Sequence, residues 1–253
     1  MDGIRGNTSG ILYVVSTPIG NLEDITLRAI STLQEVNLIA AEDTRRTRKL
    51  LTHYQIKTPL TSYFEHNEQS KSEYLLSLLK EGERIALVSD AGTPGISDPG
   101  YRLISKAIAN HISVVPVPGV SSVTAALSVS GLATHSFLFK GFIPPKKGKR
   151  RTLFNEIKDE DVTVVLYESP RRLMASLEDL LDICGDRRIV VAREMTKVFE
   201  DVIRGRVSEL IVQLKDKNIK GEITVMLEGS QDDKKIRKNE QLHDNNYTGL
   251  IHG

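Results

Sequence analysis

Short apolar runs alternate with amphipathic stretches along most of this chain, and this alternation constrains its fold more than any other feature. Runs such as Ile11–Val15, Leu38–Ala41 and Arg84–Ser89 have the length of buried strands. The stretches between them carry apolar residues at helical spacing, as at Ala29, Ile30 and Leu33. Strands that alternate with helices are typical of βαβ units and parallel sheets. We therefore expect an α/β protein.

The alternation runs through five strands and then starts again, which indicates two domains. The first set of strands is expected at Ile11–Val15, Leu38–Ala41, Leu60–Tyr63, Arg84–Ser89 and Ile112–Val117, and the second at Ser136–Gly141, Val162–Tyr167, Ile189–Arg193 and Glu222–Leu227. A chain of 253 residues can give each domain its own core. We expect an N-terminal α/β domain over 11–118 and a C-terminal α/β domain over 119–229. The polar tail over 230–253 is too poor in apolar residues to fold alone, and we expect it to be disordered.

Composition excludes several classes of protein. With 34 basic and 33 acidic residues, no overall field attracts nucleic acid or membrane, so such contacts need a local patch. The single cysteine, Cys184, rules out a disulfide within the chain, and its place at an apolar helix end is typical of a packing residue. Residues 1–10 lack the apolar core of a signal peptide, and no apolar run has the roughly 18 residues of a membrane helix. We expect a cytoplasmic protein without membrane contact.

Polar or glycine-rich segments follow four of the expected strands: Thr17–Asn21, Glu42–Arg45, Asp90–Gly100 and Glu168–Arg171. In open α/β sheets, ligands bind beyond the carboxyl ends of the strands. The segment Asp90–Gly100 holds three glycines, which let the backbone approach a ligand closely, and two prolines, which stiffen the loop. These features predict a site for a small ligand.

Several standard sites are excluded. Gly95 and Gly100 have the spacing of a phosphate-binding P-loop, but Tyr101 and Arg102 replace its Lys-Ser/Thr pair. No dinucleotide fingerprint follows the first strand, and no hydrolase nucleophile elbow surrounds Ser121 or Ser122. The six histidines show no metal-ligand spacing, and we interpret His66 and His135 as surface or hydrogen-bonded residues.

Motifs spread over residues 11–229 resemble, in order, those of the tetrapyrrole-methylase superfamily, in the version of its ribosomal RNA branch. They are Leu12–Ala29, Ala41–Arg45, Ser89–Gly100, Pro116–Ser122, Tyr167–Arg171, Ala192–Lys197 and Lys220–Glu222. Arg171 stands where that branch commonly has histidine, and the polar tail replaces its usual C-terminal extension.

The resemblance implies two αβα domains of the class III methyltransferase type, with S-adenosylmethionine bound in a bent shape in the cleft between them. The implied activity is 2′-O-methylation of the ribose of cytidine 1402 in the decoding region of 16S ribosomal RNA. The implied partners are the small ribosomal subunit and, since superfamily members are typically homodimers, a second copy of the chain.

Methyl transfer to a ribose hydroxyl needs alignment of the two reactants and removal of a proton, and it needs no metal. The residues that we expect at the cofactor are Pro18, Gly20, Asp90, Gly92, Thr93, Pro94, Ile96, Ser121 and Ser122. The candidates for proton removal or ribose positioning are Glu42, Asp43, Asp98 and Glu168. Each of these carboxylates could instead cap a loop, and the sequence does not choose among them.

RNA contact is expected at two basic segments, which would bind phosphates without reading sequence. The residues are Arg45, Arg46, Arg48, Lys146, Lys147, Lys149, Arg150 and Arg151. Two alternatives stay open: methylation of a tetrapyrrole or of a diphthine intermediate on a protein by the same fold, and a non-catalytic module that binds RNA or a nucleotide.

Overall fold

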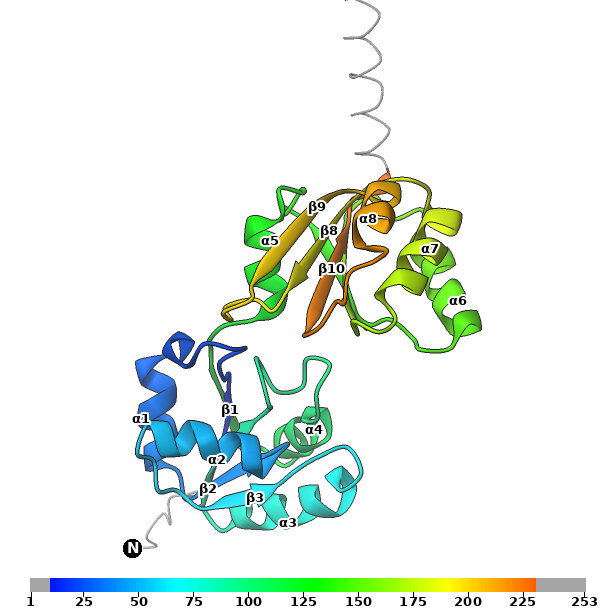
Figure 1. Cartoon of the computed structure of the whole chain (residues 1–253). Helices are drawn as coiled ribbons and strands as arrows, with labels where there is room; N and C mark the ends of the chain where they lie inside the picture. Colours follow the sequence, from blue (N-terminus) through cyan, green and yellow to red (C-terminus); the bar gives the residue numbers. More distant parts are fainter. Residues whose placement is uncertain (1–9, 231–253) are drawn as a thin grey trace, which may run out of the picture. The chain divides into compact units, whose positions relative to one another are not determined.

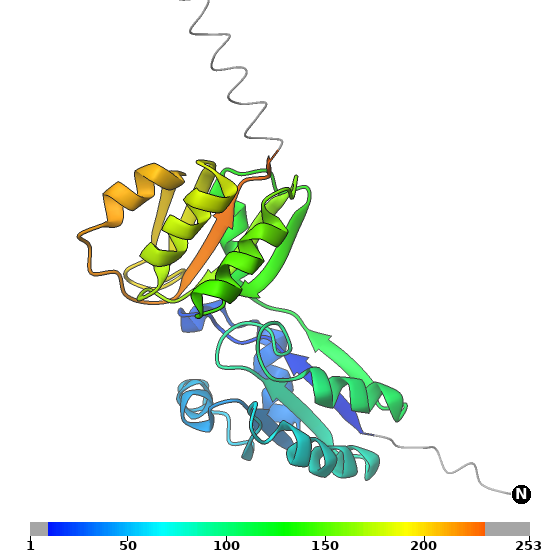
Figure 2. The same ribbon diagram turned by 90° about the vertical axis from the view of Figure 1, so that its right-hand side faces the viewer.

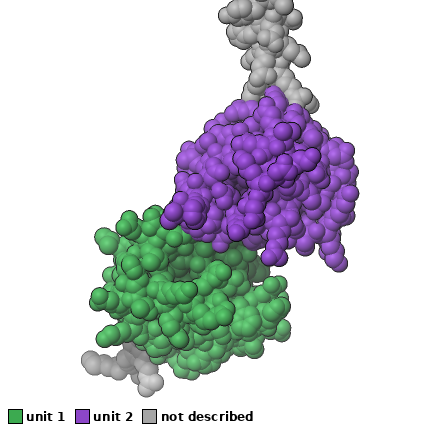
Figure 3. Space-filling model, viewed as in Figure 1, with its two compact units in different colours: residues 1–122 green, residues 123–253 purple. Residues whose placement is uncertain are grey.

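The computed structural model describes residues 10–230 and divides the chain after Ser122 into two compact units (Figure 3). Each unit holds one five-stranded sheet. The expected tail lies outside the described residues from Gln231 onward. Within residues 10–230, no helix is long and apolar enough to cross a bilayer.

The first unit is a parallel sheet in the order β3-β2-β4-β1-β5. Its strands are β1 (Ile11–Val15), β2 (Leu38–Ala41), β3 (Leu60–Ser62), β4 (Arg84–Val88) and β5 (Ser113–Val117). The helices are α1 (Leu27–Glu35), α2 (Thr44–His53), α3 (Glu68–Lys80) and α4 (Tyr101–Ala109), with a short 3-10 helix at Leu22–Asp24. All five expected strands of this unit are present within two residues of their expected ends.

Helices cover both faces of this sheet because both faces of its strands are apolar. Ile85 and Leu87 of β4 belong to a core that includes residues of α3 and α4. Ala86 and Val88 point to the opposite face, into a core that includes residues of α1 and α2. The two layers of helices are visible in Figures 1 and 2. This is the three-layer arrangement that the sequence pattern predicts.

The second unit has a mixed sheet in the order β6-β7-β10-β8-β9. Its strands are β6 (Phe137–Phe142), β7 (Thr163–Glu168), β8 (Arg188–Arg193), β9 (Asp201–Arg206) and β10 (Ile223–Leu227). Only β6 and β7 are parallel, and the other three pairings are antiparallel. Helices α6 (Lys147–Ile157), α7 (Leu173–Cys184) and α8 (Val207–Leu214) cover one face, and α5 (Ser122–Ser130) covers the other.

One strand of this unit differs from the sequence-based expectation. The strand β9 is not expected, because Asp201–Arg206 is a polar edge strand that contains Gly205 and lacks a continuous apolar run. The basic segment that begins at Lys146 leads directly into a helix, since α6 starts at Lys147. Within α6, Phe154 and Ile157 are buried on the α7 side of the core and give the helix its apolar face.

A buried ion pair joins α6 to α7 through Arg150, a residue that the sequence assigned to RNA contact. Arg150 is 6% exposed, and its Nε donates to Asp179 at 2.8 Å. Arg151 donates to Asp179 at 2.9 Å and to the exposed Asp182 at 2.7 Å. Although burial alone would raise the pKa of Asp179, hydrogen bonds from Arg151 and Arg150 hold it below its ordinary value. Arg150 therefore binds a carboxylate inside the fold and is not available to RNA phosphates.

We predict that Asp179→Ala lowers the free energy of unfolding by about 3 kcal/mol, because it leaves the Arg150 guanidinium buried without its partner. The matched control is Asp182→Ala, which removes an exposed partner of Arg151 and is expected to change stability by less than about 0.5 kcal/mol. Urea denaturation of the three proteins measures both values. Equal stabilities for the two variants would contradict the assignment.

Candidate functional site

Three strand ends of the first unit meet at one edge of its sheet. Strand β4 lies between β2 and β1 and is parallel to both, so the segments that follow Ala41, Val88 and Val15 leave from the same edge. From β1 the chain crosses over β4 to reach β2, toward one end of the sheet. From β4 it crosses over β1 to reach β5, toward the other end. Adjacent strands whose connections leave in opposite directions mark the usual ligand site of an open α/β sheet.

The loops after β1 and β4 are joined by backbone and side-chain hydrogen bonds. Thr17 and Gly92 exchange two backbone hydrogen bonds, both of 2.9 Å. The hydroxyls of Ser16 and Thr93 lie 2.7 Å apart, and the hydroxyl of Thr17 donates to the carbonyl of Ser89 at 3.1 Å. The start of the Asp90–Gly100 loop is therefore fixed to the end of β1.

The far end of the same loop is fixed to the start of α3. The Gly100 N–H donates to Oε1 of Glu68 at 2.9 Å, and Arg102 lies 3.5 Å from the other oxygen of that carboxylate. Between the two anchors, Ser97 adopts a left-handed φ of 63° and Ile96 is half exposed. A strained residue in an anchored loop is typical of a ligand-binding segment.

The end of β5 lies against the end of β1. A Cβ at Gly119 would lie 2.9 Å from the Cβ of Ser16, so only glycine allows this close approach. Ser121 and Ser122 follow and are half-buried. Of the other residues expected at the cofactor, Pro18 and Pro94 are buried, whereas Gly20 is exposed.

The end of β2 contacts the Asp90 side of the loop through a network of carboxylates. Glu42 Oε2 accepts a hydrogen bond from the backbone N–H of Asp90 at 3.2 Å. In return, Asp90 Oδ1 accepts from the backbone N–H of Asp43 at 3.0 Å, and Asp90 Oδ2 lies 3.3 Å from Arg46. The structure thus brings Glu42, Asp43 and Asp90 together at the edge where the loops meet.

The two carboxylates after β2 have opposite protonation behaviour. Burial raises the pKa of Glu42, with a further contribution from the nearby Asp90 charge, and outweighs the hydrogen bond from the Asp90 N–H. Hydrogen bonds from the Arg45 side chain and backbone hold the pKa of Asp43 far below its ordinary value. Asp43 caps α2 and binds Arg45, so its oxygens are occupied. A carboxylate with a raised pKa is the better proton acceptor, which favours Glu42.

The other two candidate carboxylates lie elsewhere. Asp98 is half-buried within the Asp90–Gly100 loop itself. Glu168 belongs to the second unit, where its buried carboxylate accepts hydrogen bonds from the Ser169 N–H, the Arg172 guanidinium and the Ser176 hydroxyl at 2.5–2.9 Å. Three donors on one buried carboxylate fix the turn between β7 and α7, which is a structural task.

An edge of the second unit gathers most of its motif residues. Because β6 and β7 are parallel and β10 is antiparallel to β7, the ends of β6 and β7 and the start of β10 share one edge. Lys197 Nζ there bridges Glu194 at 2.9 Å and Glu222 at 3.0 Å. Glu194 adopts a left-handed φ of 51°. Glu194, Lys197 and Glu222 are not among the site residues expected from the sequence. All three lie in the motifs Ala192–Lys197 and Lys220–Glu222, which could have indicated them.

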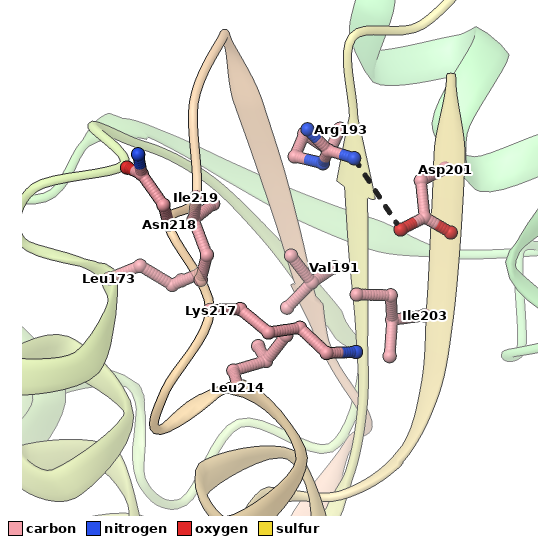
Figure 4. A pocket seen from close by; sticks show the side chains of 9 residues that line it. All are labelled: Leu173, Val191, Arg193, Asp201, Ile203, Leu214, Lys217, Asn218 and Ile219. Carbon is pink, nitrogen blue, oxygen red and sulfur yellow. Dashed lines mark ion pairs between the residues drawn. The ribbon is translucent and has the colours of Figure 1, made fainter. Parts of the chain in front are cut away.

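A small cavity lies on the α7 and α8 side of the second unit (Figure 4). It has a volume of about 100 Å³, an apolar floor that includes Val191, Ile203 and Leu214, and an ion pair of 3.7 Å between Arg193 and Asp201 at its rim. Sites for drug-sized ligands usually occupy about 300 Å³ or more, so this cavity is too small for a nucleoside. None of the site residues expected from the sequence lines it. Within residues 10–230, no group of three or more His, Cys, Asp and Glu could hold a metal ion.

The fold and the sequence both match known methyltransferases. The fold matches that of uroporphyrin-III C-methyltransferase from Thermus thermophilus with a TM-score of 0.63 and 23% identity, covering 87% of this chain and 95% of that one. Residues 11–211 match the family model of tetrapyrrole (corrin/porphyrin) methylases. The protein therefore has the tetrapyrrole-methylase fold.

The chain belongs to the tetrapyrrole methylase family. It is 51% identical over 222 residues to the Thermotoga maritima protein named ribosomal RNA small subunit methyltransferase I, covering 88% of this chain and all of that protein. It is 50% identical over 221 residues to the protein of the same name from Halalkalibacterium halodurans, covering 87% of this chain and 76% of that protein. This family uses S-adenosylmethionine as its methyl donor, as the sequence motifs implied.

The residues at the first unit's edge fit this donor. S-adenosylmethionine carries ribose hydroxyls, an amino acid group and a sulfonium cation, and it supplies an electrophilic methyl group when bound. Ser16 and Thr93 present hydroxyls, Asp90 presents a carboxylate, and the anchored loop presents backbone groups. Asp24, which also follows β1, has one buried carboxylate oxygen without a hydrogen-bond partner among residues 10–230. These acceptors and donors suit both the hydroxyl-rich and the charged parts of the molecule.

We predict that Glu42→Gln lowers kcat of methyl transfer by about 10²–10⁴-fold, because the amide cannot accept a proton, while donor affinity stays within a few-fold. In this assignment the active form of Glu42 is the carboxylate. On acidification, the parent is therefore expected to lose activity at a pH above the ordinary pKa range of glutamate. Ionisation of the partly buried Glu42 carboxylate also destabilises the fold, and this destabilisation grows as pH rises through the raised pKa. Glu42→Gln carries no such charge, so it should melt at the same temperature as the parent or a higher one at pH 7.

Rapid-quench kinetics, calorimetric titration and thermal melting measure the three quantities. Asp43→Asn is the matched control, because it changes the neighbouring carboxylate that caps α2. A Glu42→Gln enzyme that keeps more than a tenth of the parent kcat would exclude Glu42 as the proton acceptor.

Proposed function

We propose that this protein transfers a methyl group from S-adenosylmethionine to the 2′-hydroxyl of cytidine 1402 of 16S ribosomal RNA. The observation that carries the proposal is the identity of about one half, over nearly nine-tenths of the chain, to proteins named ribosomal RNA small subunit methyltransferase I. The family model matches residues 11–211, which include parts of both units and the loops that follow β1, β2, β4 and β7.

The first unit offers what the methylation of a ribose hydroxyl requires. An alcohol is a poor nucleophile at neutral pH, so its methylation requires a proton acceptor beside the donor site. Glu42 provides one, since its carboxylate contacts the N–H of Asp90 in the loop that we assign to the donor. In this proposal Pro18, Gly20, Asp90, Gly92, Thr93, Pro94, Ile96, Ser121 and Ser122 surround the donor.

RNA phosphates are proposed to bind at two basic surfaces, one in each unit. Lys146, Lys147 and Lys149 are exposed at the start of α6, whose N-terminus carries no side-chain cap from the described residues. Arg45, Arg46 and Arg48 are exposed on α2, where Arg45 and Arg46 also pair with Asp43 and Asp90. Lysines and a free helix N-terminus both favour phosphate. Arg151 is half-buried and shared with Asp179 and Asp182, so it contributes less.

The setting of the reaction is part of the same proposal. A 16S RNA substrate places the enzyme in the cytoplasm, with the small ribosomal subunit as its partner. Assembly into a homodimer is proposed from the family resemblance. The family name and the uroporphyrin-III C-methyltransferase likeness make a tetrapyrrole the natural competing substrate.

The proposal predicts that methyl-labelled S-adenosylmethionine labels 16S RNA in small subunits from cells that lack this activity. Mapping by nuclease digestion and mass spectrometry should place one methyl group on the ribose of cytidine 1402. Uroporphyrinogen III serves as the competing substrate in a parallel reaction. A methyl group on a base, at another nucleotide, or on the tetrapyrrole alone would refute the proposal.

A further inference from the structure

One aromatic side chain of the second unit is turned out of its expected place by a bulge in β6. Strand β6 pairs with β7 in the register Phe137↔Thr163, Leu138↔Val164 and Phe139↔Val165, but the next partners are Phe142 and Tyr167. Two residues of β6, Lys140 and Gly141, therefore stand opposite one residue of β7. Gly141 takes a left-handed φ of 68°, which a glycine adopts at little cost and which accommodates the extra residue.

The extra residue changes the face of the sheet on which Phe142 lies. Side chains alternate between faces along a strand, and partners in adjacent strands share a face. Without the bulge, Phe142 would stand opposite Glu168, on the side of Leu166 and the α6–α7 core. With the bulge it stands beside Tyr167, on the α5 side that also holds Phe139. The extra residue of the bulge therefore places the Phe142 ring on the opposite face of the sheet.

Phe142 packs on an aromatic support and stays largely exposed. Its ring centroid lies 5.1 Å from that of Tyr167, and the other neighbour of Tyr167 is Phe139 at 5.0 Å. Tyr167 is therefore held between two rings, whereas Phe142 is 59% exposed. A single exposed phenylalanine is unremarkable on a protein surface, but one placed by a bulge onto a fixed aromatic ring is a rigid platform.

Basic residues lie a short way along the chain from this platform. From Phe142 the chain passes through the buried Ile143 to Lys146 in four residues, so the two Cα atoms are at most about 14 Å apart. Lys147 and Lys149 follow on α6, and Arg171 follows Tyr167 by four residues at the same edge of the sheet. Aromatic rings beside a basic surface are the usual means by which proteins hold single-stranded nucleic acid. A second copy of the chain is less suited, because a symmetric contact would bring these lysines against each other.

We propose that the Phe142 ring stacks on an unpaired nucleobase of the RNA substrate while Lys146, Lys147 and Lys149 bind the adjoining phosphates. The proposal rests on the proposed function and deepens it, since it names the contact that holds the substrate strand. Stacking tolerates any base, so this contact contributes affinity and position but no sequence discrimination.

The test compares variants of Phe142 in the full-length protein, with a short single-stranded RNA of mixed sequence as the probe. Phe142→Ala and Phe142→Leu are expected to weaken RNA binding by about five- to a hundredfold, and Phe142→Tyr to keep parental affinity. The slope of log Kd against log salt should stay unchanged in these variants. Replacing the three lysines by alanine should instead lower the magnitude of that slope by about 2. The matched control is Phe137→Ala, at the other end of β6, where the ring is 42% exposed.

A second readout uses the absence of tryptophan from the sequence. Phe142→Trp introduces a single tryptophan, whose emission can be excited apart from that of the tyrosines. RNA should quench this emission by stacking, whereas the emission of Phe137→Trp should not change. Affinity for S-adenosylmethionine and the sedimentation coefficient, measured on all variants, should equal those of the parent.

RNA affinity of Phe142→Ala or Phe142→Leu within twofold of the parent would overturn the proposal. So would a changed oligomeric state with unchanged RNA affinity, which would assign the ring to a contact between copies. If the parent methylates 16S RNA and Phe142→Ala binds RNA equally well, the stacking proposal fails and the proposed function stands. If RNA quenches Phe142→Trp but the parent methylates no 16S RNA, the proposed function fails and the stacking contact stands. A parent that binds no RNA contradicts both.

Discussion

The short antiparallel bridge between Thr17 and Gly92 is the contact on which the candidate site depends. Parallel strands β1 and β4 bring their ends together, and the loops that follow them are joined to each other. Two backbone hydrogen bonds and the Ser16–Thr93 hydroxyl pair provide that link. The Glu68 carboxylate holds the far end of the same loop. The loop is thus fixed before any ligand binds, which lowers the ordering entropy that binding would otherwise cost.

The arrangement of charge at this edge follows from the same contacts. Asp90 is shared between the N–H of Asp43 and the guanidinium of Arg46, while its own N–H binds Glu42. Arg45 occupies Asp43, and the structure leaves Glu42 as the carboxylate whose pKa burial raises. Neighbouring residues of one strand end therefore differ in protonation behaviour: Asp43 caps a helix, and Glu42 is the proposed proton acceptor. Such separation of protonation behaviour is a usual sign of acid–base chemistry.

The sequence predicted the first unit well because strands such as β2 and β4 are buried on both faces and appear as continuous apolar runs. It predicted the strand-end loops for the same reason, since a glycine-rich segment after such a run has few structural explanations.

The sequence missed β9, because an antiparallel edge strand such as Asp201–Arg206 needs no continuous apolar run. It also assigned too many residues of the basic segment to RNA contact. Arg150 is bound by Asp179, which lies 29 residues further along on α7, and no local sequence pattern reports such a partner. The different environments of Glu42 and Asp43 likewise depend on hydrogen bonds that no local sequence pattern reports. The Phe142 bulge was invisible for a related reason, because alternation along β6 alone assigns that ring to the opposite face.

The proposed methyl-donor site lies at the ends of β1, β2 and β4. Amide hydrogen exchange of the full-length protein, measured with and without saturating S-adenosylmethionine, tests it most directly. Donor binding is expected to slow exchange in residues 16–21, 42–43 and 90–100, with little change over α3 or α8. Donor binding that leaves exchange in all three segments unchanged would contradict it.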